Sequence, residues 1–102
     1  MSAPNILKST AFFEVLETAE GSQTAVMYLA PGEESGPKQN EHPRSEQVLY
    51  VVQGELEAEI GDRQMTLRAG DSVIVTRETP HRFSNRSAAP ALTFNVYTPP
   101  AY

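Results

Sequence analysis

Side chains suited to binding or catalysis are few in this chain. It has two histidines, His42 and His81, and no cysteine, so disulfides and thiolate metal ligands are excluded. Two amide side chains accompany the histidines, because Asn40 lies two positions before His42 and Gln47 lies five positions after it. Several carboxylates could act as a general acid or base, but their spacing singles out none of them: Glu33, Glu34, Glu41 and Glu46.

The alternation of side chains along extended strands predicts that these groups meet. Phe83 belongs to the core, so His81, two positions earlier, shares its inward face. Asn40 and His42 share a face if their segment is extended. Gln47 opens an apolar run and faces the same way as three members of that run: Leu49, Val51 and Gln53. The two histidines and the two amides are therefore expected to converge on one interior site.

The elements that must position these residues are β-strands. Apolar residues recur at every second position, and turn residues interrupt them about every eight to twelve positions, which favours a sandwich or a barrel. We expect strands over 11–18, 23–29, 47–53, 55–60, 63–67, 72–75, 81–85 and 91–97, with 33–44 mostly loop. In the run 55–60, three glutamates face water and three apolar residues face inward. Helical periodicity is absent, so the expected fold class is all-β.

Length and charge restrict the possible partners. The 102 residues fit a single domain, 1–102, and the net charge of −5 makes an acidic surface that repels nucleic-acid phosphates. The first residues lack the pattern of a signal peptide, and no apolar run approaches the ~20 residues of a membrane span. We expect a cytoplasmic protein with neither nucleic acid nor membrane as a partner.

Residues 70–85 resemble the second motif of the cupin superfamily, G-x5-P-x-G-x2-H-x3-N. Gly70, His81 and Asn85 fall at their places in this motif, while Thr76 replaces the proline and Glu78 the second glycine. The resemblance implies a double-stranded β-helix, the jelly-roll cupin barrel. We expect Asn85 to cap the turn that follows its strand.

The first cupin motif, G-x5-H-x-H-x3-4-E-x6-G, is matched less completely. Counting back from Gly54, Gln47 stands at the glutamate, His42 at the second histidine and Asn40 at the first. Gly36 lies only four positions before Asn40, so the leading glycine is out of register.

The chain is also similar to small cupins described as mannose-6-phosphate-isomerase-like, which share its Glu-Gln pair at 46–47 and its Pro-Pro tail. The resemblance covers about 32–97, with N-terminal strands over 1–31 and a tail over 98–102. Because small cupins commonly pair, we expect a homodimer in which the apolar strand Phe12–Leu16 extends the sheet of the partner.

The resemblance further implies a metal site built from His42, His81, Gln47 and Asn40. The complete cupin set of three histidines and a glutamate is similar to arrangements that hold divalent Ni, Zn, Fe, Mn or Cu. Here the neutral amide of Gln47 leaves the charge of the ion uncompensated, which weakens binding. We expect a metal-binding cupin with a cavity for a small polar molecule and assign no reaction. Two alternatives stay open: a non-catalytic ligand-binding or sensor module without a functional metal, and a structural dimer with an occluded barrel.

Overall fold

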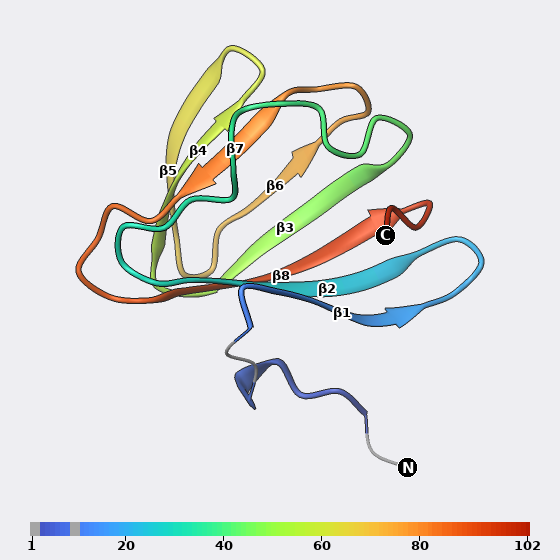
Figure 1. Ribbon diagram of the computed structural model, residues 1–102, viewed down its shortest axis with the longest axis horizontal. Helices are drawn as coiled ribbons and strands as arrows, with labels where there is room; N and C mark the ends of the chain where they lie inside the picture. Colours follow the sequence, from blue (N-terminus) through green and yellow to red (C-terminus); the bar gives the residue numbers. More distant parts are fainter. Residues whose placement is uncertain (1–2, 9–10) are drawn as a thin grey trace.

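The computed structural model describes residues 3–8 and 11–102 (Figure 1). Residues 1, 2, 9 and 10, which belong to the predicted N-terminal strand region, lie outside the described residues. The described residues contain a short 3-10 helix η1 (Ile6–Lys8) and the strands β1 (Phe13–Thr18), β2 (Gln23–Leu29), β3 (Glu46–Gln53), β4 (Glu55–Ile60), β5 (Arg63–Arg68), β6 (Ser72–Val75), β7 (His81–Ser84) and β8 (Ala91–Thr98). The predicted all-β fold is confirmed. Within residues 3–8 and 11–102, no helix is long and apolar enough to cross a membrane.

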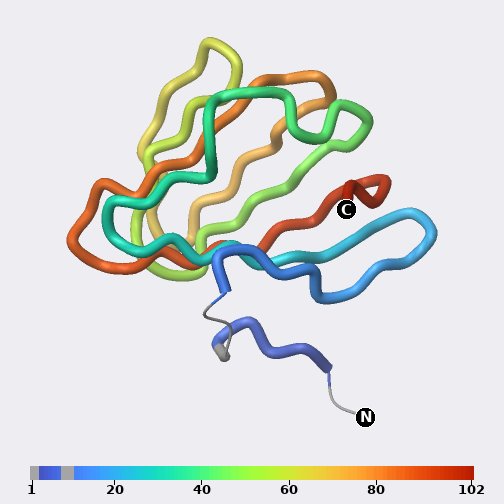
Figure 2. The backbone as a smooth tube through the Cα atoms, viewed as in Figure 1, coloured from blue at the N-terminus to red at the C-terminus, as the bar shows by residue number. Residues whose placement is uncertain are grey.

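The strands form two antiparallel sheets that face each other (Figures 1 and 2). The larger sheet has the order β1-β2-β8-β3-β6, and the smaller sheet has the order β5-β4-β7. The predicted double-stranded β-helix is confirmed, although the two sheets do not form a closed barrel. Apolar side chains from both sheets fill the space between them: Leu29, Leu49, Val51, Leu56, Val75 and Phe83.

The irregular segment between β2 and β3 runs beside β7 and extends the smaller sheet at that edge. Ser35 N donates to Phe83 O over 2.8 Å, and His81 N donates to Gln39 O over 3.1 Å. This segment is the mostly loop region expected from its Pro, Gly and polar residues. Because it returns along β7, it brings the chain near His42 to the first residue of β7, His81.

One predicted orientation along β3 is wrong. Alternation places Gln53 on the inward face with Leu49 and Val51, but Gln53 is exposed while the other two are fully buried. The β3–β8 register shifts between Val51 and Gln53. An irregularity of this kind inserts a residue on one strand and turns the following side chain to the other face.

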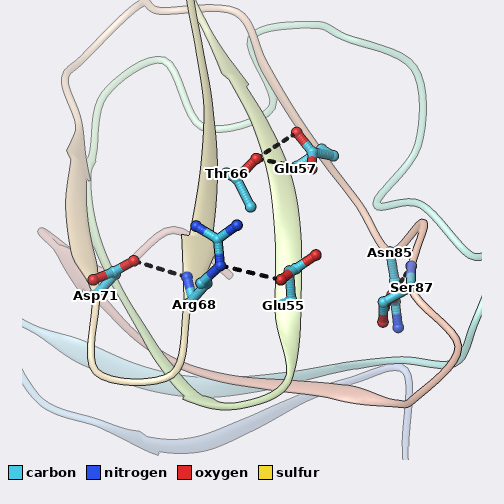
Figure 3. Close-up of polar contacts among 7 residues, drawn as sticks. All are labelled: Glu55, Glu57, Thr66, Arg68, Asp71, Asn85 and Ser87. Atoms are coloured by element: carbon cyan, nitrogen blue, oxygen red, sulfur yellow. Dashed lines mark hydrogen bonds and ion pairs between the residues drawn. The ribbon is translucent and has the colours of Figure 1, made fainter.

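The outer face of the smaller sheet is polar, as the alternation over 55–60 predicts. Across β4 and β5, Thr66 Oγ1 donates to the Glu57 carboxylate over 2.9 Å, and Arg68 Nε lies 3.3 Å from a Glu55 oxygen (Figure 3). The intervening residues Leu56, Ala58 and Ile60 are buried.

The turn after β7 is closed by Asn85, as expected from its place in the second motif. Its Oδ1 accepts hydrogen bonds from Ser87 N over 2.9 Å and from Ser87 Oγ over 2.7 Å (Figure 3). Its Nδ2 donates to the carbonyls of Leu29 and Ala89. The asparagine therefore holds this turn against the end of β2.

Candidate metal centre and pocket

His42 is held in a tight turn that leads into β3. Ser45 N donates to His42 O over 3.0 Å, and the Nδ1 of the His42 ring lies 3.2 Å from Ser45 O. Because a carbonyl oxygen only accepts, this contact is a hydrogen bond in the tautomer that carries its proton on Nδ1, and that tautomer has its lone pair on Nε2. Ser45 Oγ donates to Pro99 O over 2.7 Å and so ties this turn to the C-terminal tail. The imidazole is only 5% exposed.

Gln47 meets His42 from the interior face of β3. Its Oε1 lies 2.8 Å from His42 Nε2, while its Nε2 donates to Asn95 Oδ1 on β8 over 2.9 Å. The side chain is buried, in agreement with the predicted inward orientation. Gln47 therefore presents its amide oxygen to the His42 ring.

His81 begins β7 and completes the pair of imidazoles. The ring centroids of His42 and His81 are 4.6 Å apart, and the His81 Nδ1 lies 2.9 Å from Thr79 O. Burial lowers the pKa of His81, although the Thr79 carbonyl and the Glu41 carboxylate oppose this effect and only the His42 ring adds to it. The ring is therefore neutral near pH 7, with its proton on Nδ1 and its lone pair on Nε2.

Asn40 lies outside this cluster. It is exposed, and the pairing of its segment with β7 ends at Gln39. The chain from Asn40 to His42 is not a regular strand, so spacing by two does not give both side chains the same environment. The structure therefore brings together three of the four predicted site residues: His42, Gln47 and His81.

The chemistry of these three donors fits a transition metal. With Nδ1 of each histidine bonded to a backbone carbonyl, both rings keep Nε2 for a metal, as metal-bound histidines do. The Oε1 of Gln47 and the Nε2 of His42 lie 2.8 Å apart. With a proton on Nε2 this contact is an ordinary hydrogen bond, whereas in the Nδ1–H tautomer two lone pairs meet and a cation beside them would stabilise the contact. Adjacent ligands on an ion with bonds near 2.1 Å lie about 3 Å apart. Among the described residues no cluster of three His, Cys, Asp or Glu side chains could hold a metal, so the third donor would be the amide.

A pocket of about 220 Å³ lies beside this cluster and includes His81, Gln47 and Glu41 in its wall. Five of the eight aromatic residues of the chain line it: Phe12, Phe13, Phe83, Tyr97 and Tyr102. The sequence expectation of a cavity for a polar molecule did not foresee this apolar wall. Phe12 and Phe13 were expected to form buried or interface surface, and nothing in their spacing connects them with the tail that carries Tyr102.

The C-terminal tail covers one side of the pocket. The Tyr102 ring packs 4.9 Å from Phe13 and 5.1 Å from Tyr97 between centroids. Gln23 holds the tail, because its Nε2 donates to Tyr102 O over 2.7 Å and its Oε1 accepts from Tyr102 N over 2.9 Å. Burial raises the pKa of Tyr97 far above its ordinary value, and the neighbouring Tyr102 raises it further. The Tyr97 hydroxyl therefore keeps its proton, which it donates to the Tyr102 hydroxyl.

A larger hollow of about 670 Å³ lies on the outer face of the larger sheet. It is lined by residues 3–7 and by Tyr50, Val52 and Phe94. The described residues of its wall include no imidazole, carboxylate or amine, so they offer no group for acid–base or metal chemistry. The smaller aromatic pocket is therefore the better candidate for the functional site.

Comparisons with known proteins agree with this architecture. A family model described as a cupin domain matches residues 25–97. The tetracenomycin polyketide synthase protein TcmJ of Streptomyces glaucescens is 35% identical over 63 residues, which cover 62% of this chain and 41% of TcmJ. Protein SchB of Streptomyces halstedii is 32% identical over 71 residues, which cover 67% of this chain and 50% of SchB. The chain thus spans half or less of the length of these relatives.

The crystal structure of BH2720 from Bacillus halodurans matches with a TM-score of 0.88 at 23% identity, over 95% of this chain and 76% of BH2720.

Proposed function

This chain belongs to the cupin domain family, and we propose that it is a metal-binding cupin that holds a small, planar and largely apolar molecule beside the metal. The observation that carries the proposal is the arrangement of His42 and Gln47. In the Nδ1–H tautomer of His42, which Ser45 O favours, His42 Nε2 and the Gln47 Oε1 held by Asn95 meet with their lone pairs 2.8 Å apart. A cation resolves the repulsion that these atoms would otherwise have.

In the proposed site, His42 and His81 each supply Nε2, and Gln47 supplies Oε1. Asn40, which the resemblance placed in the set, is not included because it lies outside the cluster. Imidazole-rich sites favour Zn, Ni, Cu or Fe, and the lack of a carboxylate in the set disfavours Mn. When bound, such an ion acts as a Lewis acid that polarises an oxygen of the ligand.

The pocket wall supports the assignment of the ligand class. Aromatic rings on several sides favour a flat molecule that stacks against them, and 220 Å³ restricts its size. The Tyr97 hydroxyl, which stays protonated and is hydrogen-bonded to Tyr102, is suited to accept a hydrogen bond from a hydroxyl of that molecule. Tyr102 packs against Phe13 and Tyr97 at the mouth of the pocket, while 54% of its surface stays exposed. TcmJ is named as a polyketide synthase protein, and this name, together with the aromatic pocket wall, leads us to propose a small aromatic or polyketide-like ligand for this chain.

A second candidate function, a ligand-binding module without a metal, is favoured by the same contact. The His42–Gln47 contact is also a hydrogen bond if His42 carries a second proton or if the Gln47 amide is turned over. The pocket would then bind its ligand through stacking and through the phenol of Tyr97 alone.

Metal titration distinguishes the two functions. Zinc and nickel chloride are titrated by calorimetry into chelator-treated wild type, His42→Ala and His81→Ala, with Ser35→Ala as a pocket-wall control that removes no proposed ligand. We expect one ion per chain for wild type and Ser35→Ala, and loss of stoichiometric binding in both histidine variants. Equally weak binding by all four proteins refutes the metal site. A parallel titration with 2-naphthol, a small flat phenol, then tests whether the pocket binds a ligand without metal.

A further inference from the structure

The interior face of β8 carries two polar side chains in positions that pack against the apolar core. Thr93 is 0% exposed and Asn95 is 1% exposed, and they lie opposite Val51 and Leu49 of β3 in the register. Apolar residues would fill these positions without the cost of removing polar groups from water. Their presence points to a role beyond packing.

The two side chains form the inner end of a hydrogen-bonded chain that leads to His42. Asn95 Nδ2 donates to Thr93 Oγ1 over 3.0 Å, and Gln47 Nε2 donates to Asn95 Oδ1 over 2.9 Å. The outer end of the chain is Gln47 Oε1, 2.8 Å from His42 Nε2. Among the residues that the structure describes, no buried side-chain nitrogen or oxygen lacks a partner, so this chain is complete.

This hydrogen-bonded chain couples the orientation of the Gln47 amide, and so the end that faces His42, to the orientation of Asn95. If the Gln47 amide turned over alone, its oxygen would face Asn95 Oδ1, and two acceptors would meet without a proton between them. Gln47 can therefore turn over only together with Asn95. In the orientation of the structure an oxygen lone pair faces His42, whereas the reversed amide would present N–H groups, which repel a cation.

We propose that Asn95, supported by Thr93, is a positioning residue that holds the Gln47 oxygen toward His42 and so allows a neutral amide to act as a metal ligand. The inference rests on the proposed metal site and adds to it the residue that orients the weakest ligand. Asn95 acts through Gln47. Removing such an outer partner typically lowers metal affinity about 10- to 100-fold.

Zinc titration of the full chain tests this role. Asn95→Ala should weaken zinc binding about tenfold or more. Asn95→Asp, which keeps an oxygen acceptor for Gln47 Nε2, should bind zinc at least as tightly as wild type. The matched control is Asn85→Ala: Asn85 is also 1% exposed, but its amide donates to backbone carbonyls outside the cluster. This control should lower stability and leave the zinc affinity of the folded protein unchanged. Equal zinc affinity of wild type and Asn95→Ala overturns the inference.

Should Asn95→Ala fail to fold, the same comparison is made at Thr93, the next residue of the hydrogen-bonded chain. Thr93→Val removes the hydroxyl that accepts from Asn95 Nδ2, with little change in side-chain shape, and should weaken zinc binding. Thr93→Ser keeps the hydroxyl and should restore the affinity. Equal affinities of the valine and serine variants overturn the supporting role of Thr93.

A second readout needs no metal. In zinc-free protein, the side-chain NH₂ protons of Gln47 should exchange slowly with water because they are buried and bonded to Asn95. NMR should show faster exchange in Asn95→Ala and slow exchange again in Asn95→Asp. An unchanged Gln47 signal in Asn95→Ala overturns the positioning role. If wild type binds no zinc but the Gln47 signal depends on Asn95, the metal function fails and the positioning of Gln47 stands.

Discussion

His42 and His81 lie with their ring centroids 4.6 Å apart, and Nδ1 of each ring lies within hydrogen-bond distance of a backbone carbonyl. The carbonyls belong to Ser45 and Thr79, so Nδ1 of each ring faces a local turn and not another side chain. Both rings are thereby prepared to use Nε2 in the same small space. Their third neighbour, Gln47, has a neutral side chain, so a mutation at this position can add the negative charge that the cluster lacks.

Replacing Gln47 with glutamate should tighten metal binding. The carboxylate supplies the negative charge that the amide lacks, and we expect zinc affinity to rise about tenfold or more. Calorimetric titration of Gln47→Glu against wild type measures the change. Asn40→His is the control, because it adds an imidazole at an exposed position outside the cluster and should change little. A Gln47→Glu protein that is less stable and binds zinc no better would indicate that no cation occupies this position.

The buried His81 should make stability fall in mild acid. Burial lowers its pKa in the folded protein, so below about pH 6.5 the unfolded chain binds more protons than the folded one. The full contribution is present above that pH and is lost as the pH falls through the folded pKa. Urea unfolding of metal-free wild type and His81→Gln between pH 7.5 and 4.5 measures it. The wild-type free energy of unfolding should fall more steeply, by up to about 1.4 kcal/mol per pH unit. If the free energy of unfolding changes with pH equally in wild type and His81→Gln, the lowered pKa of His81 is contradicted.

The alternation of side chains along a strand predicted the interior positions well where the strands are regular. His81 and Asn85 share the buried side with Phe83, and Gln47 shares that of Leu49, as the period of two requires. The alternation failed at Gln53, because the register of β3 against β8 shifts after Val51 and turns the Gln53 side chain to the outer face. Nothing in the sequence reveals this shift. The alternation also failed to relate Asn40 to His42, since their segment is not a regular strand.

The aromatic pocket could not be predicted from the sequence, because its wall joins residues far apart in the chain. Phe13 and Tyr102 meet only when the tail returns to β1 and Gln23 holds it there. The partner of Gln47 was overlooked for another reason. Asn95 alternates with Phe94 and Val96, so the sequence does not reveal which side of β8 faces the interior.

Gly54 should tolerate alanine far less well than Gly32. Both glycines have positive φ, +83° and +86°, so alanine is strained equally at either position. A Cβ at Gly54 would lie 2.4 Å from Pro90 O and 2.8 Å from Ala91 Cα, whereas a Cβ at Gly32 meets nothing within 4 Å. In urea unfolding, we expect Gly54→Ala to lower the free energy of unfolding by at least about 2 kcal/mol more than Gly32→Ala does. Equal losses would mean that β8 moves away without cost.

The edge strand β1 should join two chains into a homodimer. Light scattering at micromolar concentration should then give twice the chain mass of 11.2 kDa. Val15 on β1 and Val48 on the outer face of β3 are each 38% exposed, which makes them a matched pair. Val15→Lys should give monomers, and Val48→Lys should leave the dimer intact. If instead Val48→Lys gives monomers and Val15→Lys stays dimeric, the interface is on the outer face of the larger sheet. A mass of 11.2 kDa for wild type refutes the dimer.

Gln23 should control how firmly the tail closes the pocket. Its buried amide accepts from Ala101 N and Tyr102 N and donates to Tyr102 O, so Gln23→Ala removes all three attachments. The chain lacks tryptophan, and Tyr102→Trp therefore introduces a single fluorescent reporter at the position of the closing ring.

We expect acrylamide to quench this tryptophan about twice as strongly when Gln23→Ala is added, because the freed tail exposes the ring to solvent. Gln53→Ala is the control, since Gln53 is an exposed glutamine away from the tail and should leave the quenching unchanged. Adding 2-naphthol should reduce quenching in the Tyr102→Trp protein if the ring closes over a ligand. Equal quenching with and without Gln23 would show that ring packing against Phe13 and Tyr97, with the Ser45–Pro99 hydrogen bond, is enough to hold the tail.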